Sequence, residues 1–294
     1  MALVPVANML ALSTVALMAQ TIISDIAGLR SFISTSVDSA NPRDIVIPSG
    51  VTITLGGVPL SINAGVHVRV SSTGDENAGT LDGEGLTNIF EVRPRGLLNL
   101  TGLRLIRGHA TARRPNVSTA WHDGFNTDGG FESGTAGGGV FVAWNASATL
   151  RNVDISECSA FRGGGVFVLG ELHLIGTKIH HCTAKYGGGL AALREGEALV
   201  NGPIYPAAMV SMSDFSSIAS CTVGDDTKGH GGGVHIGRGA LLIATDVTIS
   251  DSQGYWGACV FIFRDGHAKM TRASILRCGS NPRTARPKSN FTAV

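Results

Sequence analysis

Two segments of the chain gather side chains that could bind or cleave a sugar. The first is a long insertion, Thr111–Ala136, and the second is a short one, Thr222–His230. Together they contribute one tryptophan, two histidines and four aspartates: Trp121, His122, Asp123, Asp128, Asp225, Asp226 and His230. An indole ring offers a flat apolar face to a sugar, and carboxylates accept hydrogen bonds from hydroxyls or hold a cation. These seven residues form the predicted ligand-binding site.

Catalysis makes stricter demands on the same residue types. A glycoside hydrolase places two carboxyl groups about 5–9.5 Å apart across the scissile bond. A calcium-dependent lyase needs several carboxylates converging from adjacent strands, with an arginine or lysine base nearby. The two insertions lie about three repeat units apart, and acids elsewhere in the repeats alternate with cations and hydroxyls. The pattern therefore predicts no catalytic residues, and a polysaccharide lyase or glycoside hydrolase is kept as the alternative.

The elements that must hold these insertions come from an internal repeat. Gly-Gly-Gly occurs four times and a variant follows: Gly137–Gly139, Gly163–Gly165, Gly187–Gly189, Gly231–Gly233 and Gly257-Ala258-Cys259. Each unit then ends in Ile-x-x-Cys or a close variant: Ile155/Cys158, Ile179/Cys182, Ile218/Cys221, Ile249/Ser252 and Ile275/Cys278. Units of roughly 25 residues with alternating apolar strands cannot bury their inward faces alone, so they must stack into one continuous core. Leucine-rich and helical repeats would show other periodicities, which leaves a parallel β-helix of about eight coils.

The repeat alignment predicts which side chains share an environment. The five isoleucines should form one inward stack, with Cys158, Cys182 and Cys221 stacked beside it. Three outward pairs on neighbouring coils should fix the register: Asp154 with Lys178, Glu157 with His181, and Asp251 with Arg277. Because Gly108 and Cys221 occupy equivalent positions, both insertions should leave the solenoid from the same edge.

The five cysteines are predicted to make a ladder rather than a disulfide framework. Equivalent residues on adjacent coils are close enough for a disulfide, but parallel side chains hold the Cβ atoms farther apart than the bond prefers. An odd number leaves at least one thiol free. No Cys-x-x-Cys occurs, so we expect no zinc site and no cofactor. Buried thiols acting as small hydrophobes are the expected state.

The chain is expected to divide into four parts. Residues 1–19 are mostly apolar and end in a tolerable cleavage site, which predicts a signal peptide, although no lysine or arginine precedes the apolar run. Residues 20–43 hold apolar positions at helical spacing and predict a helix that caps the first coil. Residues 44–279 form the β-helix, and residues 280–294 a flexible tail. A buried N-terminal helix is the alternative for residues 1–19.

The chain resembles the right-handed parallel β-helix proteins of the pectin-lyase-like superfamily, and within it those built from polymorphic-outer-membrane-protein-type repeats. The resemblance rests on Asp25–Ile33, Asp44–Gly50, Gly79–Gly85 and the Cys-Ser-Ala-x-x-Gly-Gly-Gly-Val of Cys158–Val166, with Cys182–Leu190 matching it. The family commonly carries asparagine where this chain has cysteine. The superfamily contains lyases, hydrolases, adhesins and surface proteins, so the resemblance implies a fold and leaves the function open.

Short segments also resemble, piece by piece, the motifs of polygalacturonase-type glycosidases. They are Asn126–Gly129, Asp225-Asp226 and Gly229–Gly231. In that family successive motifs sit about one coil apart, whereas here Asp128 and Asp225 are 97 residues apart and Asp226 and Gly229 only three. No Arg-Ile-Lys motif follows. The spacing therefore argues against a shared active site.

Composition and sequons place the chain in a compartment. It has 40 glycines, 10 prolines, 43% hydrophobic and 15% charged residues, which argues against collagen and against disorder. The formal charge is +1 without a basic run, so no nucleic-acid partner is predicted. Four Asn-x-Ser/Thr sequons predict glycosylation of a secreted chain: Asn99, Asn116, Asn145 and Asn290. We expect no membrane span once the signal peptide is removed.

These observations converge on one functional hypothesis. The chain is predicted to be a secreted or cell-surface β-helix protein with a structural, adhesive or glycan-binding role and no catalysis. Its expected partner is a polysaccharide or a component of the cell surface or extracellular matrix.

Overall fold

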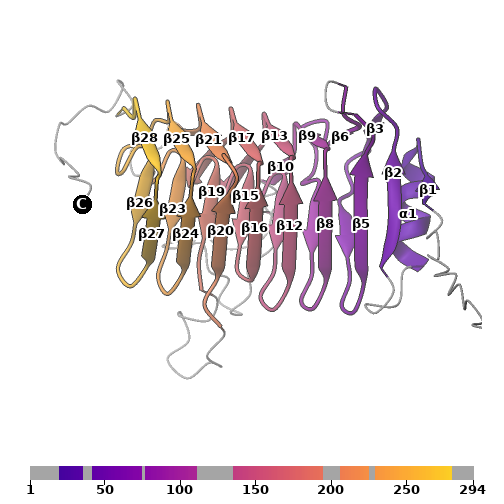
Figure 1. The fold of residues 1–294 in the computed structure, drawn as a ribbon, viewed down its shortest axis with the longest axis horizontal. Helices are drawn as coiled ribbons and strands as arrows, with labels where there is room; N and C mark the ends of the chain where they lie inside the picture. Colours follow the sequence, from indigo (N-terminus) through magenta and orange to yellow (C-terminus); the bar gives the residue numbers. More distant parts are fainter. Residues whose placement is uncertain are drawn as a thin grey trace, which may run out of the picture.

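The computed structural model of the chain describes residues 20–35, 42–74, 77–110, 135–194, 206–224 and 229–279. The described residues form four parallel sheets wound into one solenoid, together with one helix, α1 (Ile26–Thr35). Each paired strand lies parallel to a strand of the coil before or after it, so the coils stack side by side (Figure 1). This arrangement confirms the predicted parallel β-helix. The predicted signal peptide and tail lie outside the described residues.

The four sheets run along the solenoid, and we name them A to D. Sheet A contains β1 (Thr21–Ile22), β2 (Arg43–Ile47), β5 (His67–Ser72), β8 (Leu97–Thr101), β12 (Ser147–Arg151), β16 (Glu171–Ile175), β20 (Met209–Ser213), β24 (Leu241–Thr245) and β27 (His267–Thr271). Sheet B contains β3 (Thr52–Thr54), β6 (Thr80–Asp82), β9 (Arg104–Ile106), β13 (Asp154–Ser156), β17 (Lys178–His180), β21 (Ser217–Ala219), β25 (Thr248–Ser250) and β28 (Ser274–Leu276). Sheet C contains β4 (Leu60–Ile62), β7 (Phe90–Val92), β11 (Val140–Val142), β15 (Val166–Val168), β19 (Leu190–Ala192), β23 (Val234–Ile236) and β26 (Val260–Ile262). Sheet D contains β10 (His109–Ala110), β14 (Ser159–Arg162), β18 (Thr183–Tyr186) and β22 (Thr222–Val223).

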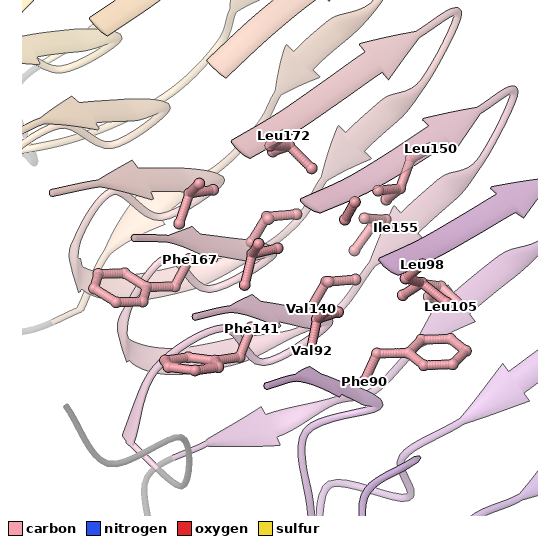
Figure 2. Close-up of a cluster of buried hydrophobic side chains, with 14 of the residues drawn as sticks. Phe90, Val92, Leu98, Leu105, Val140, Phe141, Leu150, Ile155, Phe167 and Leu172 are labelled. Atoms are coloured by element: carbon pink, nitrogen blue, oxygen red, sulfur yellow. The ribbon is translucent and has the colours of Figure 1, made fainter. Parts of the chain in front are cut away.

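Alternating side chains build the core of the solenoid. In β12, for example, Ala148 and Leu150 are buried, while the residues between and beside them are partly or fully exposed. Figure 2 shows Leu98, Leu150 and Ile155 gathered inside the coils, whereas Phe141 and Phe167 point away from that cluster. Successive side chains of a strand point to opposite faces, so about half of the strand side chains point into the solenoid. There they pack against the inward side chains of the neighbouring coils.

A left-handed residue turns the chain after each sheet B strand from β9 onward. The residue two positions after the inward aliphatic has a φ between 50° and 55° in six consecutive coils: Arg107, Glu157, His181, Ser220, Asp251 and Arg277. The next residue then points inward, and the thiols of Cys158 and Cys182 donate to the carbonyl two residues earlier, at 3.2 and 3.3 Å. The corner therefore explains why Ile-x-x-Cys recurs: its first and last residues both face the core.

The glycine triplets permit backbones of neighbouring coils to approach closely. A Cβ added to Gly164 would collide with the backbone carbonyls of Gly188 and Thr183. The first glycine of the same triplet, Gly163, has a φ of 58°, which L-residues rarely adopt. Both the turn and the close approach therefore require glycine at this corner.

The predicted isoleucine stack is confirmed by the register of sheet B. Ile155, Ile179, Ile218, Ile249 and Ile275 are successive Cα partners. The first four are fully buried, and Cys158, Cys182 and Cys221 are buried beside them. Ile275 is 45% exposed because β28 is the last strand of sheet B among the described residues and has a neighbour on one side alone.

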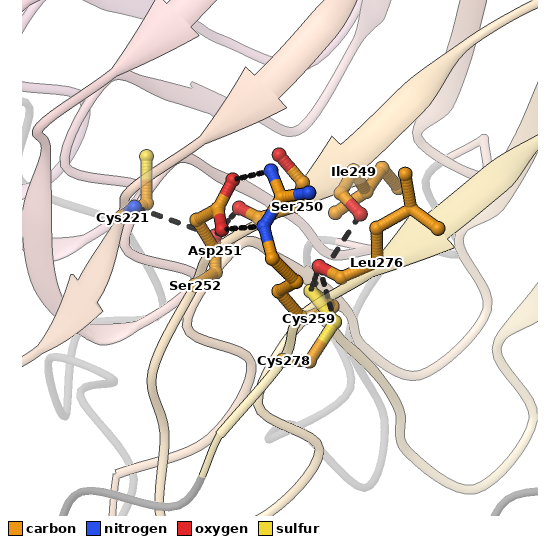
Figure 3. A network of polar contacts seen from close by, with 9 residues as sticks. Cys221, Ile249, Ser250, Asp251, Ser252, Cys259, Leu276 and Cys278 are labelled. Carbon is orange, nitrogen blue, oxygen red and sulfur yellow. Dashed lines mark hydrogen bonds and ion pairs between the residues drawn. A yellow bond between two sulfur atoms is a disulfide. The ribbon is translucent and has the colours of Figure 1, made fainter.

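The expectation of a thiol ladder is wrong for two of the five cysteines. Cys259 and Cys278 form a disulfide, with their Cα atoms 5.4 Å apart (Figure 3). Cys259 occupies the third position of the last glycine triplet, and Cys278 the last position of Ile-x-x-Cys. These two repeat positions face each other between successive coils: a Cβ added to Gly189 would lie 3.2 Å from the Sγ of Cys221. The remaining three cysteines are free and buried, as predicted.

The helix α1 lies beside β1 and β2, at the end of the solenoid opposite β28 (Figure 1). It buries Leu29 and Ile33, and the Asp25 carboxylate accepts a 2.8 Å hydrogen bond from the Gly28 amide at its start. The Arg30 guanidinium donates to backbone carbonyls of the first coil, at 2.9 Å for Leu55. Within the described ranges, no helix is both long enough and apolar enough to cross a membrane.

Candidate ligand-binding site

His230 is the one predicted site residue that the structure describes. Trp121, His122, Asp123, Asp128, Asp225 and Asp226 lie outside the described residues. The described ends of both insertions nevertheless lie on sheet D. The first insertion follows β10 and the second follows β22, and the register runs from His109 through Ser159 and Thr183 to Thr222. The two insertions therefore leave from the same edge, as predicted.

Two columns of side chains run along the solenoid beside these insertions. The first column is the residue before each glycine triplet: Ala136, Arg162, Tyr186, His230 and Trp256, which pair in succession. The second is the central residue of each sheet C strand: Phe141, Phe167, Ala191, His235 and Phe261. The residues flanking each central position face the core, which turns the central side chain outward.

The outward position does not leave the second column in solvent. Phe141 and Phe167 are 4% and 0% exposed, and His235 is 5% exposed. The rings of Phe141 and Phe167 stack with centroids 5.8 Å apart (Figure 2). An outer sheet face that buries large rings is unlike the outer faces of sheets A and B, where polar side chains alternate with the core.

The rings continue across the coils as one connected set, which we call the aromatic strip: Phe161, Arg162, Lys185, Tyr186, His230, His235 and Phe261. Tyr186 contacts Phe161 at 5.6 Å between centroids, and it contacts His230 at 5.5 Å and His235 at 5.7 Å. Phe261 contacts the same two histidines at 4.5 and 5.4 Å. All are edge-to-face or tilted arrangements, which aromatic pairs prefer.

Two cations lie over the rings of the strip. The Arg162 guanidinium is 5.0 Å from the Tyr186 centroid, and the Lys185 ammonium is 5.4 Å from that of Phe161. Arg162 is buried, and Lys185 is partly exposed. Such cation–π contacts hold long cationic side chains against aromatic rings.

Both histidines of the strip are neutral at pH 7. Burial, with the positive charge of Arg162 adding to it, lowers the pKa of His235 to about 3. Burial also lowers the pKa of His230, and Lys185 lowers it further. The Nδ1 atom of His235 is buried and has no hydrogen-bond partner among the described residues. Buried polar atoms are normally satisfied, so this nitrogen is an exception within the strip.

Three of the described carboxylates pair with arginines away from the strip. The predicted pair Asp251 and Arg277 is confirmed, with contacts of 2.5 and 2.6 Å (Figure 3). Asp246 pairs with Arg272 in the same way, one corner earlier. Asp82, 2% exposed, is held by Arg107. These pairs fix the coils in register and leave the acids on sheet B and its corners, away from the strip.

The other two predicted pairs differ in detail. Asp154 is the Cα partner of Lys178, as expected, but its carboxylate accepts a 2.7 Å hydrogen bond from His180. Glu157 and His181 occupy equivalent corners, yet no hydrogen bond or ion pair joins them in the described part of the chain. His181 instead contacts the ring of His180.

Two of the four predicted glycosylation sites are described. The Asn99 amide in β8 contacts the His67 ring at 3.1 Å and is partly buried, whereas Asn145 is exposed at a corner with a φ of 55°. Asn116 and Asn290 lie outside the described residues. Glycosylation at all four stays a prediction.

Sequence reasoning missed most of the strip because it concentrated on the insertions. Arg162, Tyr186 and Trp256 share one repeat position with His230, immediately before the glycine triplet or its variant. An alignment of the repeat units at that position identifies the column. The repeat predicts that the side chains of Phe167 and His235 point outward. It does not predict which other side chains cover them, so their burial could not be found from the sequence.

Comparison with known proteins adds little. No protein-family model and no curated protein matches the sequence. Among solved structures, the fold is similar to an alginate lyase from Paenibacillus sp. str. FPU-7, at 12% identity over 89% of this chain and 99% of that one, with a TM-score of 0.43. A likeness at this level carries no argument about function.

Proposed function

We propose that the chain is a non-catalytic carbohydrate-binding protein whose aromatic strip holds an extended polysaccharide. The connected line of rings from Phe161 to Phe261 carries this proposal. It crosses the coils along the solenoid axis, with neighbouring coils about 4.8 Å apart. Regularly spaced rings suit a ligand that repeats along its length.

The polar groups of the strip support a sugar rather than a purely apolar partner. Tyr186 and His230 are partly exposed and offer a phenol and an imidazole to a ligand, and Lys185 adds a positive charge beside the rings. Apolar surfaces with a few placed polar groups are typical of small-molecule and sugar sites. The insertions with Trp121 and Asp226 begin at the same edge of the solenoid and would add contacts to the same ligand.

The sequence supports a proposed location and partner. Residues 1–19 and the four sequons support a secreted or cell-surface protein, and the resemblance to polymorphic-outer-membrane-protein-type repeats supports an adhesive role. The partner would then be a polysaccharide of a cell surface or extracellular matrix.

A polysaccharide lyase is the second candidate, and one observation favours it. Arg162, Tyr186 and His230 lie in one column, so a cation, a phenol and a neutral imidazole are close together. β-Elimination uses a cation beside the uronate carboxylate and a base for the neighbouring proton. The same residues would therefore serve either function, and activity separates the two.

A panel of immobilised neutral and acidic polysaccharides tests both. We expect the wild-type chain to bind at least one of them and Tyr186→Ala to weaken that binding tenfold or more. Phe215→Ala is the matched control, because Phe215 is an 84% exposed ring between β20 and β21, on a different corner. Equal loss in both variants, or no binding at all, would overturn the proposal. Release of unsaturated, ultraviolet-absorbing sugars by the wild type would replace it with the lyase.

A further inference from the structure

A second cluster of ring nitrogens lies on the outer face of sheet B, away from the aromatic strip. His180 ends β17, and His181 follows it with a φ of 53°. In an extended strand these neighbours would point to opposite faces, but the left-handed corner turns the second ring toward the first. Their Nδ1 atoms are 2.7 Å apart, with the ring planes nearly perpendicular at 84°.

A carboxylate sets the tautomer of the first ring. The Asp154 Oδ1 atom on the preceding coil accepts a 2.7 Å hydrogen bond from His180 Nε2. A neutral imidazole carries one proton, so its Nδ1 atom is left with a bare lone pair, directed at His181.

We infer that His180 and His181 chelate a divalent transition-metal ion, such as Zn²⁺ or Cu²⁺, through their two Nδ1 atoms. The arrangement of carboxylate, histidine and open nitrogen is the one that metal-binding histidines use, with the carboxylate orienting the ring and raising its basicity. On binding, His181 shifts its proton from Nδ1 to Nε2 through solvent, so its charge is unchanged. This inference is independent of the sugar-binding proposal.

The surroundings limit the site to two protein ligands. No group of three or more His, Cys, Asp or Glu side chains that could hold a metal occurs among the described residues. Water completes the coordination. Tetrahedral zinc with Zn–N bonds of about 2.0–2.1 Å needs its nitrogens about 3.3 Å apart. His181 is exposed, so its ring can rotate to open the present 2.7 Å separation.

Charged side chains of the same and neighbouring coils lie near the site. Arg104 and Lys178 lie near Asp154 and act on its carboxylate. Glu157 stands at the equivalent corner of the preceding coil and Ser220 at that of the next. Arg107 in turn lies near Glu157, so the ring nitrogens and not a surplus of negative charge provide the affinity.

Calorimetric titration of the metal-free chain with Zn²⁺ and with Cu²⁺ tests the inference. We expect one site per chain, with a tenfold or greater loss of affinity in His180→Ala and in His181→Ala. Asp154→Asn should also weaken binding about tenfold, since partners of ligating histidines contribute 10–100-fold. His173→Ala is the matched control, because both nitrogens of that ring are occupied, by Ser211 at 2.6 Å and Glu171 at 3.1 Å.

The folding of each variant and the location of the bound metal are checked with the same set of proteins. Circular dichroism and the unfolding midpoint of each variant should match the wild type, since both rings lie on the surface. Absence of stoichiometric binding by the wild type, or undiminished binding by a variant lacking both histidines, would overturn the site. Equal weakening in His173→Ala would do the same.

Discussion

The middle coils and the terminal coil use the same repeat positions with different chemistry. In the middle, Cys182 and Cys221 are buried thiols, each lying against the third glycine of the preceding triplet. In the terminal coil that glycine is replaced by Cys259, which bonds to Cys278. The middle coils are packed on both sides and have no covalent bond there, whereas the last coil of the described residues exposes Ile275 and contains a disulfide. The cysteine at the third triplet position and the place of the coil in the stack together distinguish the two regions.

The thiols of the middle coils are inert for the same reason. Burial raises the pKa of Cys182 well above its usual value, and a hydrogen bond with Cys182 and burial raise that of Cys221. A protonated, buried thiol is a poor nucleophile and a weak metal ligand. The ladder therefore acts as packing, as the sequence predicted.

The largest expected effect comes from the closer backbone packing of the middle coils compared with the terminal coil. Gly164→Ala places a Cβ against carbonyls of Gly188 and Thr183, and should lower the free energy of unfolding by about 3 kcal/mol or more. Gly279→Ala, beside the terminal coil, has nothing within 4 Å of the added atom and should change it by less than about 0.5 kcal/mol. Urea unfolding measures both. Similar effects would contradict the close packing of the middle coils.

The next effect compares the loss of the disulfide in the terminal coil with the loss of a buried thiol in the middle coils. Replacing both Cys259 and Cys278 with serine should cost about 2–4 kcal/mol, the usual loss for a disulfide. Cys182→Ser should cost less than about 1 kcal/mol, because Ser252 already occupies this repeat position and donates to the Ser250 carbonyl at 3.0 Å. Guanidinium unfolding with and without a dithiol reductant checks this: the reductant should destabilise the wild type and leave the double variant unchanged. A large loss in Cys182→Ser would mean that the thiols do more than pack.

The sequence predicted the repeating parts of the molecule and missed what breaks the repeat. The register of Ile155, Ile179 and Ile218 could be found from spacing, because a solenoid gives equivalent residues equivalent environments. The disulfide was missed because Cys259 was grouped with a glycine triplet and not with the position that this triplet faces. The strip was missed because burial on an outer face depends on packing between distant segments, as with His235.

The third effect lies at the boundary between the regions, where His235 packs against Phe261 of the terminal coil. The folded-state pKa of His235 is about 3, against an ordinary value of 6.5. Between these values the unfolded chain binds a proton that the folded chain does not, so stability should fall as pH falls from about 6.5 toward 3, by up to about 1.4 kcal/mol per pH unit. His235→Phe, which repeats the side chain of Phe167 and Phe261 in the same column, should remove this dependence. Identical pH profiles for the two proteins would show that His235 is not buried.

The smallest effect concerns the surface ion pair of the terminal coil. Arg277→Gln should leave the unfolding midpoint at pH 7 nearly unchanged, because exposed ion pairs contribute little. The hydrogen bonds from Arg277 and Ser250 lower the pKa of Asp251 to about 2, so the variant should raise that pKa toward its ordinary value. Any stability from this pair is present above the ordinary pKa and lost as pH falls toward about 2. Carboxylate NMR titration of both proteins measures the shift, and an unchanged pKa would contradict the pairing.

Hydroxyl-radical footprinting with and without the bound polysaccharide tests most directly the claim that the aromatic strip binds a polysaccharide. We expect Phe161, Tyr186 and Phe261 to be protected from oxidation when the ligand binds, while Phe215 on the distant corner is oxidised equally with and without it. Protection of Phe215 with an unchanged strip would contradict the claim.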